Sequence, residues 1–173
     1  MVNEPHSGQT RPMADHVLVL LRHAKSDWSV GCADIDRPLA PRGRRQAPDA
    51  GAWLAKHVDA IDLAVVSSAE RAQATWRLVA ESLEAPPRVT VSDEPYAASA
   101  EELVEVVAGL PEEARTVVLV GHNPGLEDFA AMLTGEDVAL PTSAIAVIDI
   151  DGPWATVGEA SARLVTSGRP PSA

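Results

Sequence analysis

The sequence predicts an α/β fold in which a mostly parallel sheet lies between two layers of helices, a three-layer sandwich. Three short runs of branched apolar residues, at 16–21, 63–68 and 116–122, each end in a polar cluster. Such runs are typical of strands that are buried on both faces. Stretches with helical spacing lie between them, so strands and helices alternate along the chain, which favours parallel strands.

The helical stretches are marked by their apolar spacing and by their end signals. Two of them repeat apolar residues at turn intervals: Ala72, Trp76, Val79 and Leu83 in one, and Leu103 and Val107 in the other. Ser99 and Glu102 have the spacing of a capping box. Asn123 and Pro124 supply an N-cap and a first helical residue, and Gly135 is expected to end that helix.

The last part of the domain is expected to form two antiparallel strands at one edge of the sheet. Residues 143–151 and the segment WATVGEAS, 154–161, have the residue types of strands. Gly152 and Pro153 between them favour a tight turn.

One domain is expected over residues 15–165, since a chain of 173 residues with 46% hydrophobic side chains closes one substantial core. The segments 1–14 and 166–173 are rich in Pro, Gly, Ser and polar residues. Both are therefore expected to be disordered tails.

Charge and cysteine content restrict the partners. The 25 acidic residues exceed the 14 basic ones and leave a formal charge of -11, so nucleic acid is not an expected partner. The N-terminus lacks the apolar core of a secretory signal and no run of 18 apolar residues occurs, so no membrane partner is expected. Cys32 is the only cysteine, which excludes an internal disulfide and favours a cytoplasmic location.

Histidines and arginines follow the three predicted parallel strands. Arg22 and His23 come after the first strand, Arg71 lies shortly after the second, and His122 ends the third. Ligands of an open parallel sheet bind beyond the carboxyl ends of its strands, so these side chains are expected at one rim. Guanidinium groups bind oxygen atoms in pairs and stay charged, which suits a phosphate dianion.

Each of these residues also has a structural interpretation. A histidine at a strand end is often a packing or surface residue, and an arginine there is often a solvated cap. Arg71, however, falls in the first turn of its predicted helix, where the helix dipole disfavours a cation unless an anion compensates. The coincidence of four such residues at equivalent strand ends favours a phosphate site.

Four segments carry a resemblance to a known family: LLRHAKSDW, DRPLAPRG, VVSSAERAQAT and VGHNPGLED. In order and spacing they resemble the motifs of the histidine phosphatase superfamily, whose fold is called phosphoglycerate mutase-like, and specifically its short SixA-type branch of phosphohistidine phosphatases. The resemblance covers residues 16–151. It implies that His23 is the nucleophile that accepts the phosphoryl group, and that Arg22, Arg71 and His122 bind the phosphoryl oxygens.

The implied roles set the protonation expected of two histidines. His23 must be neutral to attack phosphorus, and the cations around it lower its pKa, while its second nitrogen is expected to donate to a backbone carbonyl or a similar acceptor. His122 is expected to stay protonated against the phosphate dianion, aided by amides of the following helix. No metal or other cofactor is then required, and His6, His16 and His57 show no metal-ligand spacing.

The superfamily generally uses a carboxylic acid to protonate the leaving oxygen. Glu94 resembles the residue at the family's position after the central strand, with Asp93 as the fallback, and the alternative is a loop carboxylate that caps nearby amides. An imidazole leaves with a pKa of about 7 and needs a weaker acid than an alkoxide does. The sequence has no motif that clearly marks a catalytic carboxylic acid, which favours phosphohistidine as the substrate.

Three further residues are expected near the phosphate. Arg37 resembles a basic residue at the mouth of the family's pocket, and its pairing with Asp34 or Asp36 is the alternative. Lys25 and Ser26 follow the nucleophile and are expected to line the same pocket.

The implied activity is hydrolysis through a covalent phosphohistidine at His23. No long insertion separates the motifs to form a lid, which favours a phosphohistidine-bearing partner protein such as a phosphotransfer domain. The alternatives are a broad phosphatase for sugar phosphates or nucleotides and, less favoured, a phosphoprotein-binding module without turnover. A mutase is disfavoured because it would need more basic contacts than Arg37 and Lys25 offer.

Overall fold

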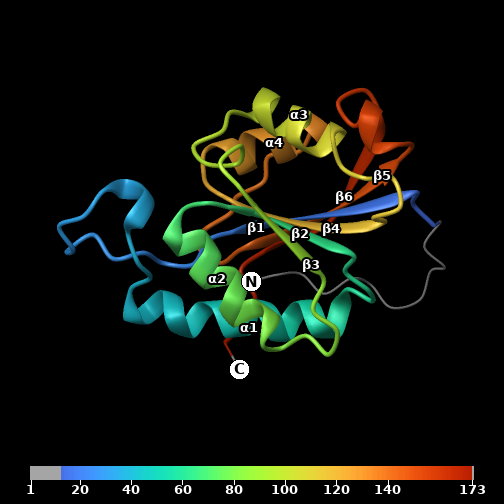
Figure 1. The fold of residues 1–173 in the computed structure, drawn as a ribbon. Coiled ribbons are helices and arrows are strands. Elements are labelled where there is room, and N and C mark those ends of the chain that lie inside the picture. The colour runs from blue at the N-terminus through green and yellow to red at the C-terminus, as the bar shows by residue number, and fades with distance from the viewer. Residues whose placement is uncertain (1–12, 173) are drawn as a thin grey trace.

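Within residues 13–172, which the computed structural model describes, six strands form one mixed sheet with α-helices on both faces (Figure 1). In chain order the elements are β1 (His16–Arg22), α1 (Pro41–His57), β2 (Leu63–Ser67), α2 (Glu70–Ala80), β3 (Arg88–Ser92), α3 (Ala100–Ala108), β4 (Thr116–Gly121), α4 (Gly125–Thr134), β5 (Ile145–Asp151) and β6 (Ser161–Gly168). Short 3-10 helices lie at Asp34–Asp36 and Trp154–Thr156.

The strand order of the sheet is β3-β2-β4-β1-β5-β6. β3, β2, β4 and β1 are parallel, whereas β5 runs antiparallel to both β1 and β6. The four parallel strands therefore end at the same edge of the sheet. The predicted α/β fold, with a mostly parallel sheet and antiparallel pairing at one edge, is confirmed.

Side-chain alternation along the strands divides the core into two layers. Leu18 and Leu20 of β1 point to the face covered by α3 and α4, while Val19 and Leu21 point to the face covered by α1 and α2. Figure 1 shows the two helix pairs on opposite sides of the sheet. Because both faces are buried, the central strands are continuously apolar rather than alternating.

The region after β5 differs from the expected pair of strands. The segment 154–161 forms a 3-10 turn and further turns, and β6 begins only at Ser161. Trp154 explains the difference, because its side chain is fully buried and its indole nitrogen donates to the carbonyl oxygen of Ala114 at 2.8 Å. The prediction of a strand over 154–161 was therefore wrong.

The C-terminal segment also differs from its predicted tail. β6 continues to Gly168, and the Nε of Arg169 donates to the carbonyl oxygen of Thr142 at 2.9 Å, so the segment 166–169 belongs to the fold. The expected N-terminal tail, 1–14, which includes His6, lies outside the described residues except for its last two. Within residues 13–172 no helix has the length and apolar character needed to span a bilayer.

Helix ends follow the predicted signals at two of three places. The Ser99 hydroxyl accepts from the backbone of Glu102, whose side chain accepts from the backbone of Ser99, so the capping box is confirmed. Gly135 ends α4 in the left-handed conformation, with φ of 71°. Asn123 does not cap α4, because its amide nitrogen donates to the carbonyl oxygen of Leu140 at 2.9 Å.

Gly43 allows the first turn of α1 to lie against the loop after β1. A Cβ atom at this position would lie 2.1 Å from the carbonyl oxygen of Lys25, which no packing tolerates. We expect Gly43→Ala to lower the free energy of unfolding by about 1–3 kcal/mol, measured by urea unfolding. Gly109→Ala is the control, because its Cβ would meet only ordinary contacts of 3.6 Å. Equal unfolding midpoints for the two variants would contradict this account.

Candidate active site

The carboxyl ends of the parallel strands meet at a pocket of about 240 Å³. Its wall contains Arg22, His23, Lys25, Ser26, Trp28, Arg37, Arg71, His122, Asn123 and Thr142. Arg22 is the last residue of β1, Arg71 lies in the first turn of α2, and His122 follows β4. The topology thus brings together the side chains that the sequence placed at one rim.

His23 is buried and its ring is held by the backbone of the next residue. Its Nδ1 lies 2.8 Å from the carbonyl oxygen of Ala24. A carbonyl only accepts, so Nδ1 carries the proton and Nε2 keeps a free lone pair. Burial first, and then the positive charges near it, including that of Arg71, lower the pKa of His23 to about 3 although the bond to Ala24 opposes this. His23 is therefore neutral, and burial contributes more than the cations that the sequence emphasised.

His122 also lies inside the pocket, with its ring centroid 5.0 Å from that of His23. Its Nε2 lies 2.7 Å from the hydroxyl oxygen of Ser67, the last residue of β2. Burial first, and then the charge of Arg71, lower the pKa of His122 to about 4. The prediction of a protonated His122 concerns the pocket with a bound dianion, so this lowered pKa does not contradict it. A bound dianion would raise this pKa.

Several buried nitrogen atoms of the pocket residues lack partners. Among residues 13–172, the Nε atoms of Arg22, Arg37 and Arg71 and the Nδ1 of His122 are buried without a hydrogen-bond partner. A buried unpaired donor costs about 1–3 kcal/mol, and guanidinium donors match the oxygens of a phosphoryl group. Within the same residues, no group of three or more His, Cys, Asp or Glu side chains is placed to hold a metal ion.

Asp34 takes a larger part in the site than the sequence indicated. Its Oδ1 accepts from Arg37 at 2.9 Å, and its Oδ2 accepts from Arg71 at 3.0 Å and from the Tyr96 hydroxyl at 2.8 Å. The hydrogen bond from Arg37 first, and then that from Tyr96, hold the pKa of Asp34 well below its usual range. Asp34, not Asp36, is therefore the carboxylate that joins the two arginines.

Arg37 lines the pocket and also pairs with the carboxylate of Asp34, so the pairing is confirmed and a contact with the phosphate stays a prediction. Its Nη1 donates to the Ser26 hydroxyl, and its guanidinium carbon lies 3.6 Å from the centroid of the Trp28 ring. Trp28 is 73% exposed. Trp28 lies in the first motif, LLRHAKSDW, but the sequence assigned it no role. Thr142, which also lines the pocket, lies in a loop that carries no sequence signal.

Glu94 does not line the pocket. It is exposed, and both its carboxylate and its backbone nitrogen bond to the hydroxyl of Ser92, each at 3.2 Å. Asp93 is exposed as well. The strand that precedes them, β3, is an edge strand rather than a central one. The Glu94 carboxylate thus accepts from a side-chain hydroxyl, whereas the alternative had it cap nearby amides.

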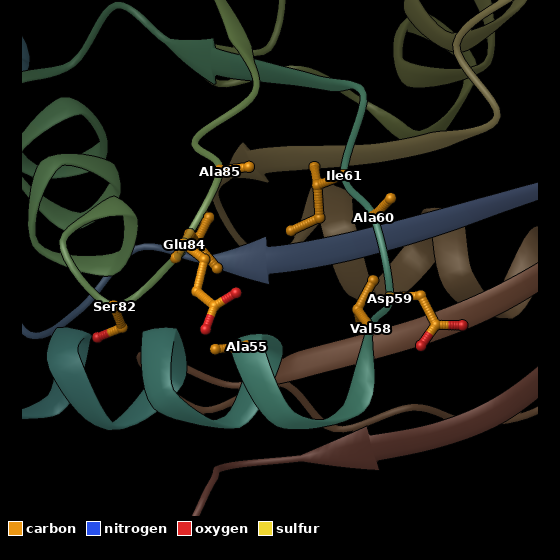
Figure 2. A pocket seen from close by; sticks show the side chains of 9 residues that line it. Ala55, Val58, Asp59, Ala60, Ile61, Ser82, Glu84 and Ala85 are labelled. Carbon is orange, nitrogen blue, oxygen red and sulfur yellow. The ribbon is translucent and has the colours of Figure 1, made fainter.

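A second hollow, of about 340 Å³, lies where the chain enters β2 and β3, at the opposite edge of the sheet (Figure 2). Its charged side chains are those of Asp59 and Glu84, both acidic. Acidic walls repel phosphate, so this hollow has none of the chemistry found around His23.

The low pKa values of the two pocket histidines predict a stability that depends on pH. Unfolded histidine has a pKa of about 6.5, so the unfolded chain binds protons on both rings below that pH. In the native protein His23 and His122 stay neutral until the pH approaches about 3 and about 4. The contribution of the two histidines to the free energy of unfolding is complete above pH 6.5. Acidification removes it, by about 2 kcal/mol between pH 6 and 5. Urea unfolding at these pH values measures the loss. An equal loss in His23→Asn/His122→Asn would contradict the assignment.

Comparison with known proteins places the chain in a family. The family model of the histidine phosphatase superfamily (branch 1) matches residues 18–94. An uncharacterized protein of Mycobacterium tuberculosis is 38% identical over 156 residues, which cover 84% of this chain and 96% of that protein. The structure of a candidate phosphohistidine phosphatase, SixA, of Nakamurella multipartitia is 32% identical, with a TM-score of 0.81 over 90% of this chain and 96% of that one. A protein histidine phosphatase SixA complexed with tungstate shares the fold, with a TM-score of 0.77 and 23% identity over 89% of this chain and 97% of that one.

The chain belongs to the histidine phosphatase superfamily and is a phosphatase. Its strand order, its motif order and the histidine pair at the carboxyl edge of the sheet agree with that membership. Within the superfamily, the chain is a member of the SixA-type branch.

Proposed function

We propose that this phosphatase removes the phosphoryl group from a phosphohistidine of a partner protein, through a covalent intermediate on Nε2 of His23. One observation carries the proposal: a buried, neutral imidazole, fixed by its bond to Ala24, lies in a pocket walled by Arg22 and Arg71. A neutral nitrogen nucleophile beside fixed cations is what transfer of a phosphoryl group requires.

The chemistry follows from these atoms. Nε2 of His23 attacks phosphorus while the bond from phosphorus to the substrate's imidazole breaks, and the arginines bind the oxygens on which charge develops. The substrate ring carries a proton on its other nitrogen, so it leaves as neutral imidazole. The proton stays on Nδ1, which donates to the carbonyl oxygen of Ala24, and this hydrogen bond stabilises the positive charge on the phosphorylated ring. Water then attacks the same phosphorus and releases phosphate, and His23 returns to its neutral form.

His122 changes its role when the phosphoryl group arrives. The dianion raises the pKa of His122 from about 4, so that the ring can take up a proton and donate to a phosphoryl oxygen. Ser67, on the other side of the ring, keeps it in place through the 2.7 Å contact with Nε2.

The leaving group supports phosphohistidine over an ester. No carboxylate lines the pocket within the part of the chain described, and Asp34, which touches the lining arginines, is held ionised by them. An imidazole leaves without a strong acid, whereas an alkoxide needs a proton. The resemblance to SixA phosphohistidine phosphatases points to the same substrate class.

Phosphate release from two kinds of substrate tests the proposal. We expect kcat/KM for a phosphohistidine peptide to exceed that for a sugar phosphate or a nucleoside monophosphate by about 100-fold, because the esters lack acid assistance. A higher value for either ester would replace the proposal with the broad phosphatase. Glu94→Gln is expected to keep the peptide activity, and a loss of more than about ten-fold would restore Glu94 as the acid.

A further inference from the structure

We infer that the catalytic pocket continues into an arginine-lined groove that binds acidic side chains beside the phosphohistidine of the partner protein. The inference rests on the proposed function, which makes a phosphohistidine the ligand of the catalytic pocket. It adds the chemistry of the surrounding protein surface, which the catalytic residues do not specify.

The groove is a hollow of about 300 Å³ at the start of α1. Arg42 and Arg45, both exposed, come from the first turns of this helix, and Arg169 comes from the segment after β6. One acidic residue, Asp49, also lines the groove. Three guanidinium groups around one hollow outweigh this single carboxylate and leave the groove positive.

Hydrogen bonds join residues of the groove to residues of the catalytic pocket. Gln46 lines the groove, and its Oε1 accepts from the backbone of Lys25 at 3.2 Å and from the hydroxyl of Thr142 at 3.3 Å. Lys25 and Thr142 line the catalytic pocket. Arg169 donates to the carbonyl oxygen of Thr142 at 2.9 Å. When the phosphohistidine of a partner enters the pocket, the residues that flank it in the partner therefore lie over Thr142, near the arginines of the groove.

The distribution of charge favours a ligand here. Seven of the 14 Lys and Arg residues line these two adjoining hollows, on a chain whose formal charge is -11. Among residues 13–172, no hydrogen bond or ion pair joins the side chain of Arg42 or Arg45 to another residue. No acidic residue lies in the first turn of α1, where the helix dipole disfavours cations. Arg42 and Arg45 therefore interact unfavourably with the helix dipole, and a bound anion would offset this cost.

The occupant that this surface fits is an acidic protein segment. Elsewhere the negative field of the chain repels acidic surfaces, so the groove and pocket guide an acidic partner to the one place where hydrolysis occurs. Carboxylates that flank the phosphohistidine would pair with Arg42 and Arg45 while the phosphoryl group binds beside His23.

Two phosphohistidine peptides that differ only in their flanking residues, three Glu or three Gln on each side, test the inference. We expect kcat/KM for the Glu peptide to be about ten-fold higher, since each exposed pair contributes modestly, and this ratio to fall as NaCl is added. Arg42→Gln/Arg45→Gln should bring the ratio close to one. Arg88→Gln, which removes an exposed arginine at the start of β3, is the control and should keep the parental ratio.

Charge reversal gives a result that misfolding does not imitate. Arg42→Glu/Arg45→Glu should prefer a peptide flanked by Lys over the one flanked by Glu. If the parent protein hydrolyses the Glu and Gln peptides with equal kcat/KM, the groove does not bind acidic residues, although phosphohistidine hydrolysis stands. If the parent protein hydrolyses neither peptide, the proposed function itself is overturned. Faster hydrolysis of a small bisphosphate ester, abolished in the same variant, would assign the groove to a second phosphate and overturn the protein partner.

Discussion

His23→Ala is expected to lower kcat/KM for phosphate release by roughly 10⁴-fold or more, the scale seen when a covalent nucleophile is removed. The variant loses the atom that forms the bond to phosphorus, and no other neutral imidazole with a fixed tautomer lines the pocket in the part of the chain described. His23 packs at the edge of the core, so a melting curve must accompany the rate to show that the variant is folded.

Trapping of the intermediate gives the direct readout. The parent protein, mixed with substrate labelled on phosphorus, should carry label on His23 after an alkaline quench, because phosphoramidates survive base and not acid. His57→Ala is the matched control, since His57 lies on α1 with its Nδ1 2.9 Å from the carbonyl oxygen of Trp53, outside the pocket. Label in His23→Ala, or its absence from the parent, would exclude a covalent phosphohistidine at this residue.

Arg71→Gln is expected to lower kcat/KM by about 10²–10³-fold, the effect of removing one donor to a developing oxyanion. Gln keeps hydrogen-bonding atoms and most of the side-chain volume but has no charge. Arg71→Lys keeps the charge and loses the planar fork, so an intermediate loss is expected. Arg77→Gln is the control on the same helix, because Arg77 is exposed and pairs with Glu70 at 2.7 Å.

Tungstate affinity separates a binding defect in Arg71→Gln from a structural one. If Arg71 holds the oxygens of the phosphoryl group, its loss should weaken tungstate binding by about ten-fold or more while the unfolding midpoint falls only slightly. Parental rate and parental affinity in this variant would remove Arg71 from the phosphate site. The same measurements on Arg77→Gln give the reference values.

Much of the fold could be predicted because its signals are local. A strand buried on both faces must be apolar throughout, as β1 is, and a parallel strand must end at the same edge as its neighbours. Those two facts were enough to place Arg22, His23 and His122 together before any contact was known. The capping box at Ser99 and the left-handed glycine at 135 are local for the same reason.

The features that the sequence did not reveal depend on contacts between distant segments. Glu94 follows an edge strand, and the sequence does not encode strand order in any single segment. The turn at Trp154 exists because a carbonyl 40 residues away accepts its indole proton. Asp34 reaches Arg71 only because the loop after β1 folds over the start of α2.

The sequence by itself determined the fold class, the family and the edge of the sheet at which the chemistry occurs, because those follow from residue order and from the period of apolar residues. The tertiary structure alone decided that the pKa of His122 is lowered and that Arg169 donates to Thr142. Burial and long-range contacts set both, since a pKa depends on how much water surrounds a ring and a groove depends on which segments meet.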